Sequence, residues 1–346
     1  MKKIFIRSPY YIQVAETGQA GSKIEVFLWT DDSGVPSTPT YTLTKEIPSP
    51  SQIDTSYNIS NLAKDFISVK YPTYTALPYY EDKNIWCWMI VKRYKLSGSV
   101  YVLLDEEWFT CLNGYSNYEQ GYNYSLTSTV LPLFNDSLTY KVYSANIYFD
   151  IFIEPSDTYE TIVKYYNAAN TLISTKEIVE ADGNESMYKV PLIANSVRMS
   201  IEQDEPLFDI FTEWVCEPKY TPKTVAFINR YGGWQFLTFF KASKESIDVT
   251  STKFDLMPED LNYNIKIGQT RTLNHNGKQK IRMNTGFVQE SYFELMQDLL
   301  LSEVVLIDNK PATVKTNSLD YKKRLDGLIN YEVEFEYAFN LIQNVR

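Results

Sequence analysis

The chain has 346 residues, of which 44% are hydrophobic, so it is long enough for two or three domains with their own cores. Its formal net charge of −10 argues against a nucleic-acid-binding body, because phosphate contacts need clustered lysine and arginine. No segment approaches eighteen consecutive apolar residues, so the sequence predicts no membrane span.

Aromatic residues make up 15% of the chain, and 28 of them are tyrosines. They fall in short runs typical of β-strands, which predicts a mainly β fold of two to three β-sandwich-like domains. We expect a β-rich domain over residues 1–128, an immunoglobulin- or fibronectin-like sandwich over 129–217, and a β-rich α+β domain over 218–346. Tyrosine also covers interfaces at low entropic cost, which favours an assembly or recognition protein.

The three cysteines, Cys87, Cys111 and Cys216, are widely spaced, odd in number and form no CxxC pair. This pattern indicates free, mostly buried thiols in a protein folded in a reducing cytoplasm. The basic opening at Lys2 and Lys3 is followed by no apolar stretch of signal-peptide length, so we expect synthesis in the cytoplasm.

The first 112 residues are expected to form strands and one short helix. Ser60 is expected to cap that helix, which covers residues 61–67. The polar run 92–99 is interpreted as a hairpin loop between two dense strands. The expected strands cover residues 10–14, 23–29, 41–47, 85–91 and 100–104.

Residues 130–217 predict a β-sandwich, because strand-like runs recur at short intervals with turn residues between them. Turns are expected at 167–170 and 181–184, and the prolines at 218 and 222 mark a domain boundary. The expected strands cover residues 140–143, 146–153, 160–166, 171–179, 187–190 and 196–202.

The C-terminal part is expected to combine two hairpins, one clear helix and one long strand. Residues 229–233 end in two glycines and predict a tight hairpin turn. Apolar residues at helical spacing predict the helix near residues 290–301, and a second hairpin follows at 304–315. Residues 328–340 alternate between apolar and mainly acidic side chains, which is the pattern of a long, half-buried strand.

Two surfaces are candidate interfaces. The first is a tyrosine-rich loop at 115–124, which shows no period and is expected to become ordered against a partner. Its tyrosines are Tyr115, Tyr118, Tyr122 and Tyr124. The second is the acidic face of the long strand, formed by Glu332, Glu334 and Glu336. That face is interpreted either as a solvated outer sheet face or as a contact with Lys322, Lys323 and Arg324 of a neighbouring copy.

No catalytic, cofactor-binding or metal-binding residues are predicted. His275 is the only histidine, lies between asparagines and is expected in a turn. The acidic runs 105–107 and 204–205 are interpreted as solvated surface, although a glycosidase would need two carboxylates facing each other across a cleft. Residues 182–185 lack the spacing of a calcium loop, and Gly232 and Gly233 lack that of a phosphate loop.

Six segments near the two ends of the chain carry a family resemblance: residues 6–10, 21–25, 47–50, 57–60, 229–234 and 328–337. They resemble virion structural proteins of tailed bacteriophages of Bacteroidetes hosts, including crAss-like phages. The resemblance implies a non-enzymatic subunit built into the particle, in a ring of the neck or tail. Because the matching segments are structural, it carries over no site residues.

Three functions are open at this point. The first is a virion component, made in the host cytoplasm, that forms a homo-oligomeric ring of six or twelve copies beside other tail, neck or portal-proximal proteins. The second is a receptor- or glycan-binding appendage, suggested by the tyrosine-rich loop together with Trp86, Trp88 and Trp108. The third, a carbohydrate-active enzyme on a β-sandwich, rests only on scattered carboxylates.

Overall fold

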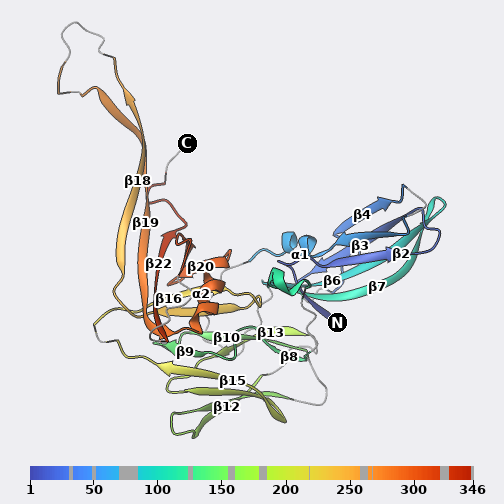
Figure 1. Cartoon of the computed structure of the whole chain (residues 1–346), viewed down its shortest axis with the longest axis horizontal. Coiled ribbons are helices and arrows are strands. Elements are labelled where there is room, and N and C mark those ends of the chain that lie inside the picture. The colour runs from blue at the N-terminus through green and yellow to red at the C-terminus, as the bar shows by residue number, and fades with distance from the viewer. Residues whose placement is uncertain are drawn as a thin grey trace. The chain divides into compact units, whose positions relative to one another are not determined.

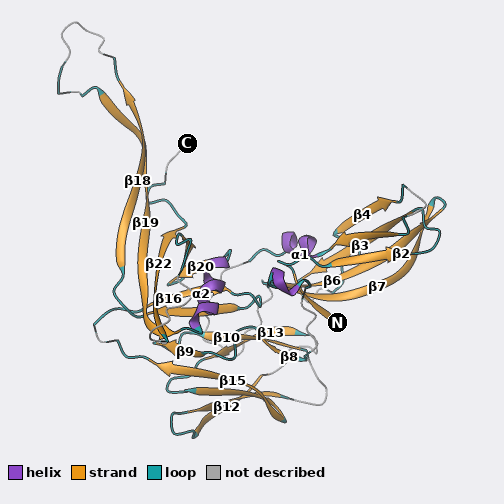
Figure 2. Cartoon of the chain, in the orientation of Figure 1, coloured by secondary structure: helices purple, strands orange, loops and turns teal. Residues whose placement is uncertain are grey.

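The computed structural model describes residues 1–30, 34–48, 52–69, 85–123, 128–154, 160–178, 185–217, 219–257, 264–266, 268–319 and 327–343. These residues are mainly β, with strands in five sheets and two α-helices, which confirms the predicted fold class (Figure 2). The chain divides into two compact units, Met1–Trp214 with Ile228–Gln235, and Val215–Phe227 with Phe236–Arg346. Neither of the two described α-helices is long and apolar enough to cross a membrane.

In the first unit, a five-stranded sheet carries the N-terminal core (Figure 1). A two-stranded sheet of β2 (Tyr11–Ala15) and β5 (Asp54–Asn58), together with helix α1 (Ser60–Phe66), contributes to the same apolar core. Val26 and Phe27, on opposite faces of β3 (Gly21–Trp29), are both buried, so both faces of that strand are covered. The order in the larger sheet is β1 (Lys2–Phe5), β7 (Val100–Leu112), β6 (Trp86–Ser97), β3 (Gly21–Trp29) and β4 (Tyr41–Glu46).

Two local predictions in this region are wrong. The polar run 92–99 is not a loop, because β6 extends through it to Ser97 and pairs there with β7. Lys92 lies opposite Glu106 and Arg93 opposite Asp105, and Arg93 Nε donates to Asp105 Oδ1 at 2.6 Å, so charge pairs join the two strands where a loop was expected. Ser60 is the first residue of α1 rather than its cap, and its hydroxyl donates to Asn58 Oδ1 at 2.7 Å.

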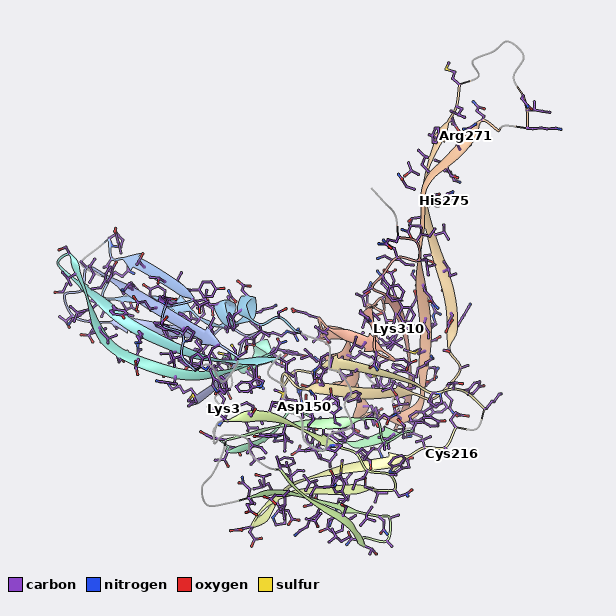
Figure 3. All side chains as sticks on the ribbon, turned by 180° about the vertical axis from the view of Figure 1, so that it is seen from behind. Lys3, Asp150, Cys216, Arg271, His275 and Lys310 are labelled. Atoms are coloured by element: carbon purple, nitrogen blue, oxygen red, sulfur yellow. The ribbon has the colours of Figure 1, made fainter. Side chains whose placement is uncertain are left out.

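The three cysteines are free thiols, as predicted. Cys87 and Cys111 lie opposite each other on β6 and β7 and are buried, and this burial raises the pKa of the Cys111 thiol. Cys216 is exposed (Figure 3).

The strands of the region predicted to form a sandwich also lie in the first unit, where they form two sheets. A three-stranded sheet has the order β13 (Ser186–Pro191), β10 (Tyr148–Ile153), β8 (Val130–Pro132). The rings of Tyr140 and Phe149, from the two sheets, lie 5.1 Å apart. Strand β15 (Glu205–Trp214) was not predicted, because only the single residue Asp204 separates it from β14 (Arg198–Gln203). The second sheet has the order β12 (Leu172–Ile178), β11 (Thr161–Tyr166), β14 (Arg198–Gln203), β15 (Glu205–Trp214), β9 (Thr139–Val142).

A seven-stranded sheet carries the C-terminal part of the chain, with helix α2 (Tyr292–Leu301) at the predicted place. The predicted alternation of the last strand is confirmed, since Tyr331, Val333 and Phe335 are buried. The strand ends earlier than expected, and Phe339 lies beyond it and is exposed. The order is β17 (Trp234–Phe239), β16 (Lys223–Ile228), β20 (Val305–Ile307), β21 (Lys310–Val314), β22 (Leu328–Tyr337), β19 (Thr270–Gln289), β18 (Lys244–Asp255).

The last two strands of this sheet continue together beyond β22 (Figure 1). β19 has 20 residues, and only its second half, from Lys280, pairs with β22, whereas residues 270–279 pair with β18 alone. We call β18 together with residues 270–279 the ribbon. All twelve residues of β18 are exposed. The ribbon contains a β-bulge, at which Asn274 and His275 lie opposite Ser251 and Asn274 has a φ of +53°.

Candidate interaction surfaces

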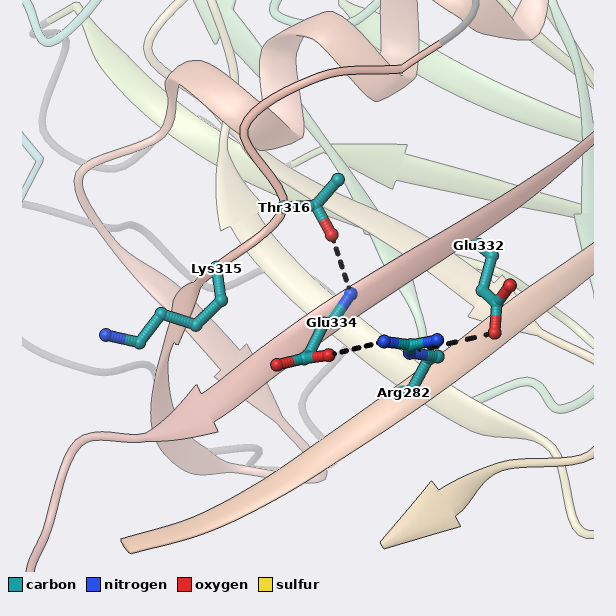
Figure 4. A pocket seen from close by; sticks show the side chains of 5 residues that line it. All are labelled: Arg282, Lys315, Thr316, Glu332 and Glu334. Atoms are coloured by element: carbon teal, nitrogen blue, oxygen red, sulfur yellow. Dashed lines mark hydrogen bonds and ion pairs between the residues drawn. The ribbon is translucent and has the colours of Figure 1, made fainter. Parts of the chain in front are cut away.

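The acidic face of β22 lies beside basic residues of the same sheet. In the register between β22 and β19, Glu334 lies opposite Arg282 and Glu336 lies opposite Lys280. Directly opposite side chains of an antiparallel pair share a face, so charges of opposite sign meet there. Arg282 Nη2 donates to Glu334 Oε2 at 2.9 Å, and Arg282 Nε lies 3.8 Å from Glu332 Oε1 (Figure 4).

Glu336 is only 8% exposed and pairs with Lys278 at 3.1 Å and with Lys315 at 3.2 Å. Burial alone would raise the pKa of Glu336, but hydrogen bonds from these two lysines outweigh burial and hold the pKa below its ordinary value. The hydrogen bond from Arg282 likewise lowers the pKa of Glu334. Both carboxylates are therefore ionised at neutral pH and are paired with cations of their own chain.

An open polar hollow lies over these ion pairs, lined by Arg282, Lys315, Thr316, Glu332 and Glu334 (Figure 4). The Thr316 hydroxyl accepts a hydrogen bond from Glu334 N at 2.8 Å. Among the three acids, Glu332 is the most exposed, with 56% of its side chain accessible. Its predicted partners Lys322, Lys323 and Arg324 lie outside the described residues, so a contact between copies at this face stays a prediction.

The tyrosine-rich loop is anchored within the first unit by Asn123, which is buried. Its side chain accepts a hydrogen bond from Phe5 N at 2.9 Å and donates to Phe5 O at 2.7 Å and to Ser8 O at 3.0 Å. Ser116 N donates to the Ser8 hydroxyl at 2.8 Å. These contacts fix both ends of the segment 116–123 on the same N-terminal stretch.

Between these anchors the loop forms the short 3₁₀ turn Tyr118–Gln120, which ends at Gly121 with a φ of +71°. The turn presents Tyr118, which is 100% exposed, and Tyr122 is 66% exposed. Tyr115 is partly buried under Arg7, whose guanidinium lies 4.9 Å from the ring centre. Tyr124 lies outside the described residues. The loop therefore has a defined backbone within the chain itself and holds two aromatic side chains outward.

The tryptophans considered for glycan recognition are mostly in the core. Trp86 and Trp88 are 1% and 5% exposed, and their rings lie 4.6 Å apart in an edge-on arrangement. Trp108 is 39% exposed. Of the three, only Trp108 is open to a ligand in the first unit.

The residues considered for chemistry lie on different elements of the fold. His275 is not in a turn but in the ribbon, where its Nε2 lies 2.5 Å from the Thr272 hydroxyl (Figure 3). Asp105 pairs with Arg93 on the neighbouring strand, and Asp204 forms the turn between β14 and β15. Residues 182–184 lie outside the described residues. Among the residues that the structure describes, no group of three or more potential metal ligands occurs.

One charged cluster was not predicted, because it joins residues far apart in the sequence. Lys3 is 1% exposed, and its amine donates to Glu154 Oε2 at 2.8 Å and to Ser128 O at 3.2 Å. Nearby, Glu185 is 4% exposed and accepts a hydrogen bond from the Thr110 hydroxyl at 2.9 Å. Burial raises the pKa of Glu185, and its second oxygen has no hydrogen-bond partner among the described residues.

The predicted hairpin at 229–233 is confirmed, and the structure adds a docking role within the first unit. Asn229 Nδ2 donates to Leu133 O at 2.7 Å, and Trp234 N donates to the buried Asp150 at 2.6 Å. At Gly232, where φ is +87°, an added Cβ would lie 2.9 Å from the amide nitrogen of Asn113. The loop is thus a tightly fitted structural junction, for which the glycines were the only sequence signal.

No protein-family model and no curated protein matches this sequence. The resemblance to phage virion proteins therefore stays a prediction from the sequence, and the surfaces described above carry the functional argument.

Proposed function

We propose that the chain is a non-enzymatic structural component of a tailed phage particle. It self-associates into a symmetric ring of six or twelve copies in the tail or neck and contacts other tail, neck or portal-proximal proteins of the virion. The six segments that resemble virion proteins support this proposal, and the tyrosine-rich loop supplies a surface suited to it.

The observation that carries the proposal is the fully exposed Tyr118 on an anchored loop. An exposed aromatic ring on a backbone that is already fixed loses little conformational entropy when a partner covers it. Such residues dominate the binding energy of protein interfaces. In a ring, each copy presents the same loop to the next one, so a modest contact is repeated around the circle until every interface is satisfied.

The test is the native mass of the purified chain, with Tyr118→Ala as the variant and Tyr11→Ala as its matched control. Tyr11 is 62% exposed and lies on β2, also in the first unit. We expect a six- or twelvefold species, weakened roughly tenfold or more by Tyr118→Ala and unchanged by Tyr11→Ala. A wild-type chain that stays monomeric at assembly concentrations contradicts the proposal.

The net charge of −10 fits a ring through which DNA passes without adhering. The purified chain should then show no measurable binding to duplex DNA at physiological salt. Tight binding under those conditions contradicts this part of the proposal.

A receptor- or glycan-binding appendage is the second candidate, and the exposed Tyr118, Tyr122 and Trp108 favour it. An appendage subunit should form trimers and bind host polysaccharide, whereas a ring subunit should do neither. Glycan binding lost in Trp108→Ala, together with a threefold mass, would replace the ring proposal.

A further inference from the structure

β18 is the longest edge strand in the described part of the chain. β18 is the last strand of its sheet, and among the described residues only β19 pairs with it. All twelve of its residues are exposed. Along such an edge, alternate residues direct their backbone N–H and C=O groups away from the sheet, which makes it a template for another strand.

The sequence of this edge is complementary to itself. In a twofold-symmetric antiparallel pair, opposite residues share a face, so odd-numbered residues of one copy meet odd-numbered residues of the other. With Val249 on the axis, Glu245 of each copy lies opposite Lys253 of the other. The two copies then gain two cross-strand ion pairs and a central contact between the two valines.

Placing the twofold axis at either neighbouring residue gives a less favourable pairing of charges. An axis at Asp248 places two aspartates opposite each other, and an axis at Thr250 places Glu245 opposite Asp255. Like charges directly opposite destabilise a strand pair. The charges of β18 therefore select one register out of three.

The apolar residues of β18 fit the same register. Ile247 and Val249 are 60% and 65% exposed and lie on the face that continues the core side of the sheet, since Glu245 on that face lies opposite the buried Ile281. Leu341 and Ile247 crowd over Gly277, where an added Cβ would lie 3.2 and 3.3 Å from them. A second copy would bring its own Ile247 and Val249 to this exposed apolar group.

We propose that β18 pairs with β18 of a second copy of this chain, antiparallel and with Val249 on the twofold axis. The pair forms about ten backbone hydrogen bonds and joins the two seven-stranded sheets into one. This inference goes beyond the proposed function and does not depend on it, because a twofold contact joins copies in pairs and does not by itself close a ring.

The experiment measures the self-association of the full chain by sedimentation, using charge reversals at the two paired positions. At concentrations below those at which any larger assembly forms, the wild-type chain should form a species of twice its 40.2 kDa mass. Glu245→Lys alone places lysine opposite Lys253, and Lys253→Glu alone places glutamate opposite Glu245. The self-association of each variant should therefore be at least about tenfold weaker than that of the wild type. An equimolar mixture of the two variants restores both ion pairs and should associate like the wild type.

Lys176→Glu is the matched control, because Lys176 is an exposed lysine on β12, which is also an edge strand. It should leave the association unchanged. The proposal is overturned by a wild-type chain that remains monomeric at about 100 µM, or by a mixture as weak as its components. A ring of six or twelve copies whose mass none of the variants alters would support the proposed function and overturn this pairing.

Discussion

The chain contains two long antiparallel hairpins, β6–β7 and β18–β19, and they differ in what surrounds them. β6 is flanked by β3 and β7 by β1, and the first six residues of β6 are all buried. β18 has a partner on one side only and buries none of its residues. An isolated two-stranded hairpin is marginally stable in water, so the ribbon depends on the sheet at its base. In contrast, β6–β7 is supported by β3 along most of β6 and by β1 at the end of β7.

The largest expected difference in stability is between a substitution at the base of the ribbon and one in the ribbon itself. Phe335 of β22 is 0% exposed and packs edge-on against Phe239 with ring centres 5.8 Å apart. Phe335→Ala should lower the free energy of unfolding by about 3–5 kcal/mol, because it leaves a cavity. Phe254→Ala, on the ribbon at 37% exposure, should cost less than about 1 kcal/mol. Urea unfolding of both variants measures the difference, and similar losses would mean that the ribbon is packed like a core.

Turns show the same contrast at a smaller scale. Gly232 and Gly98 both have positive φ, but an added Cβ at Gly98, the turn of β6–β7, meets nothing within 4 Å. Gly98→Ala should therefore cost only the backbone strain of about 1 kcal/mol, whereas Gly232→Ala adds a clash with backbone nitrogens and should cost at least about 2 kcal/mol. Thermal unfolding compares the two variants. Equal losses would show that the junction loop shifts to accept a side chain.

This contrast also explains which elements could be predicted from sequence. β22 buries one face, so Tyr331, Val333 and Phe335 had to alternate with polar residues, and the alternation was visible. β18 buries no face, so its sequence carries no such constraint, and no separate strand was predicted there. The run 92–99 was wrongly predicted to be a loop for a related reason, because Lys92 and Arg93 pair with acids on the neighbouring strand.

The candidate surfaces also differ in how much of each could be predicted from the sequence. The exposed Tyr118 and the acidic face of β22 were predicted from local composition and period. The partners of that face were not, because Arg282 is 52 residues from Glu334 in the sequence and meets it only through strand register. The cluster of Lys3 and Glu185 was missed because neither residue stands out within its own segment.

The smallest expected effects concern one buried acid beside each hairpin. Glu185 accepts a hydrogen bond from Thr110 of β7 and has a raised pKa through burial, so the folded state binds its proton more tightly and gains stability as pH falls from 7 towards 4.5. Glu336 pairs with Lys278 of β19 and has a lowered pKa, so its contribution is present above pH 4.5 and is lost as pH falls below that value.

Glutamine substitutions should therefore act in opposite directions. Glu185→Gln keeps an acceptor for Thr110 without the buried charge, so it should raise stability at pH 7 by about 1 kcal/mol and flatten the gain between pH 7 and 4.5. Glu336→Gln removes the charge that holds Lys278 and Lys315, so it should lower stability at pH 7 by about 1 kcal/mol. As pH falls below 4.5, this variant should lose less stability than the wild type, because it has no carboxylate at this position to protonate. Urea midpoints at several pH values test both signs. A destabilising Glu185→Gln at pH 7 would contradict this prediction. It would mean that the ionised carboxylate is stabilised by a cation in the folded state, so that burial does not raise its pKa.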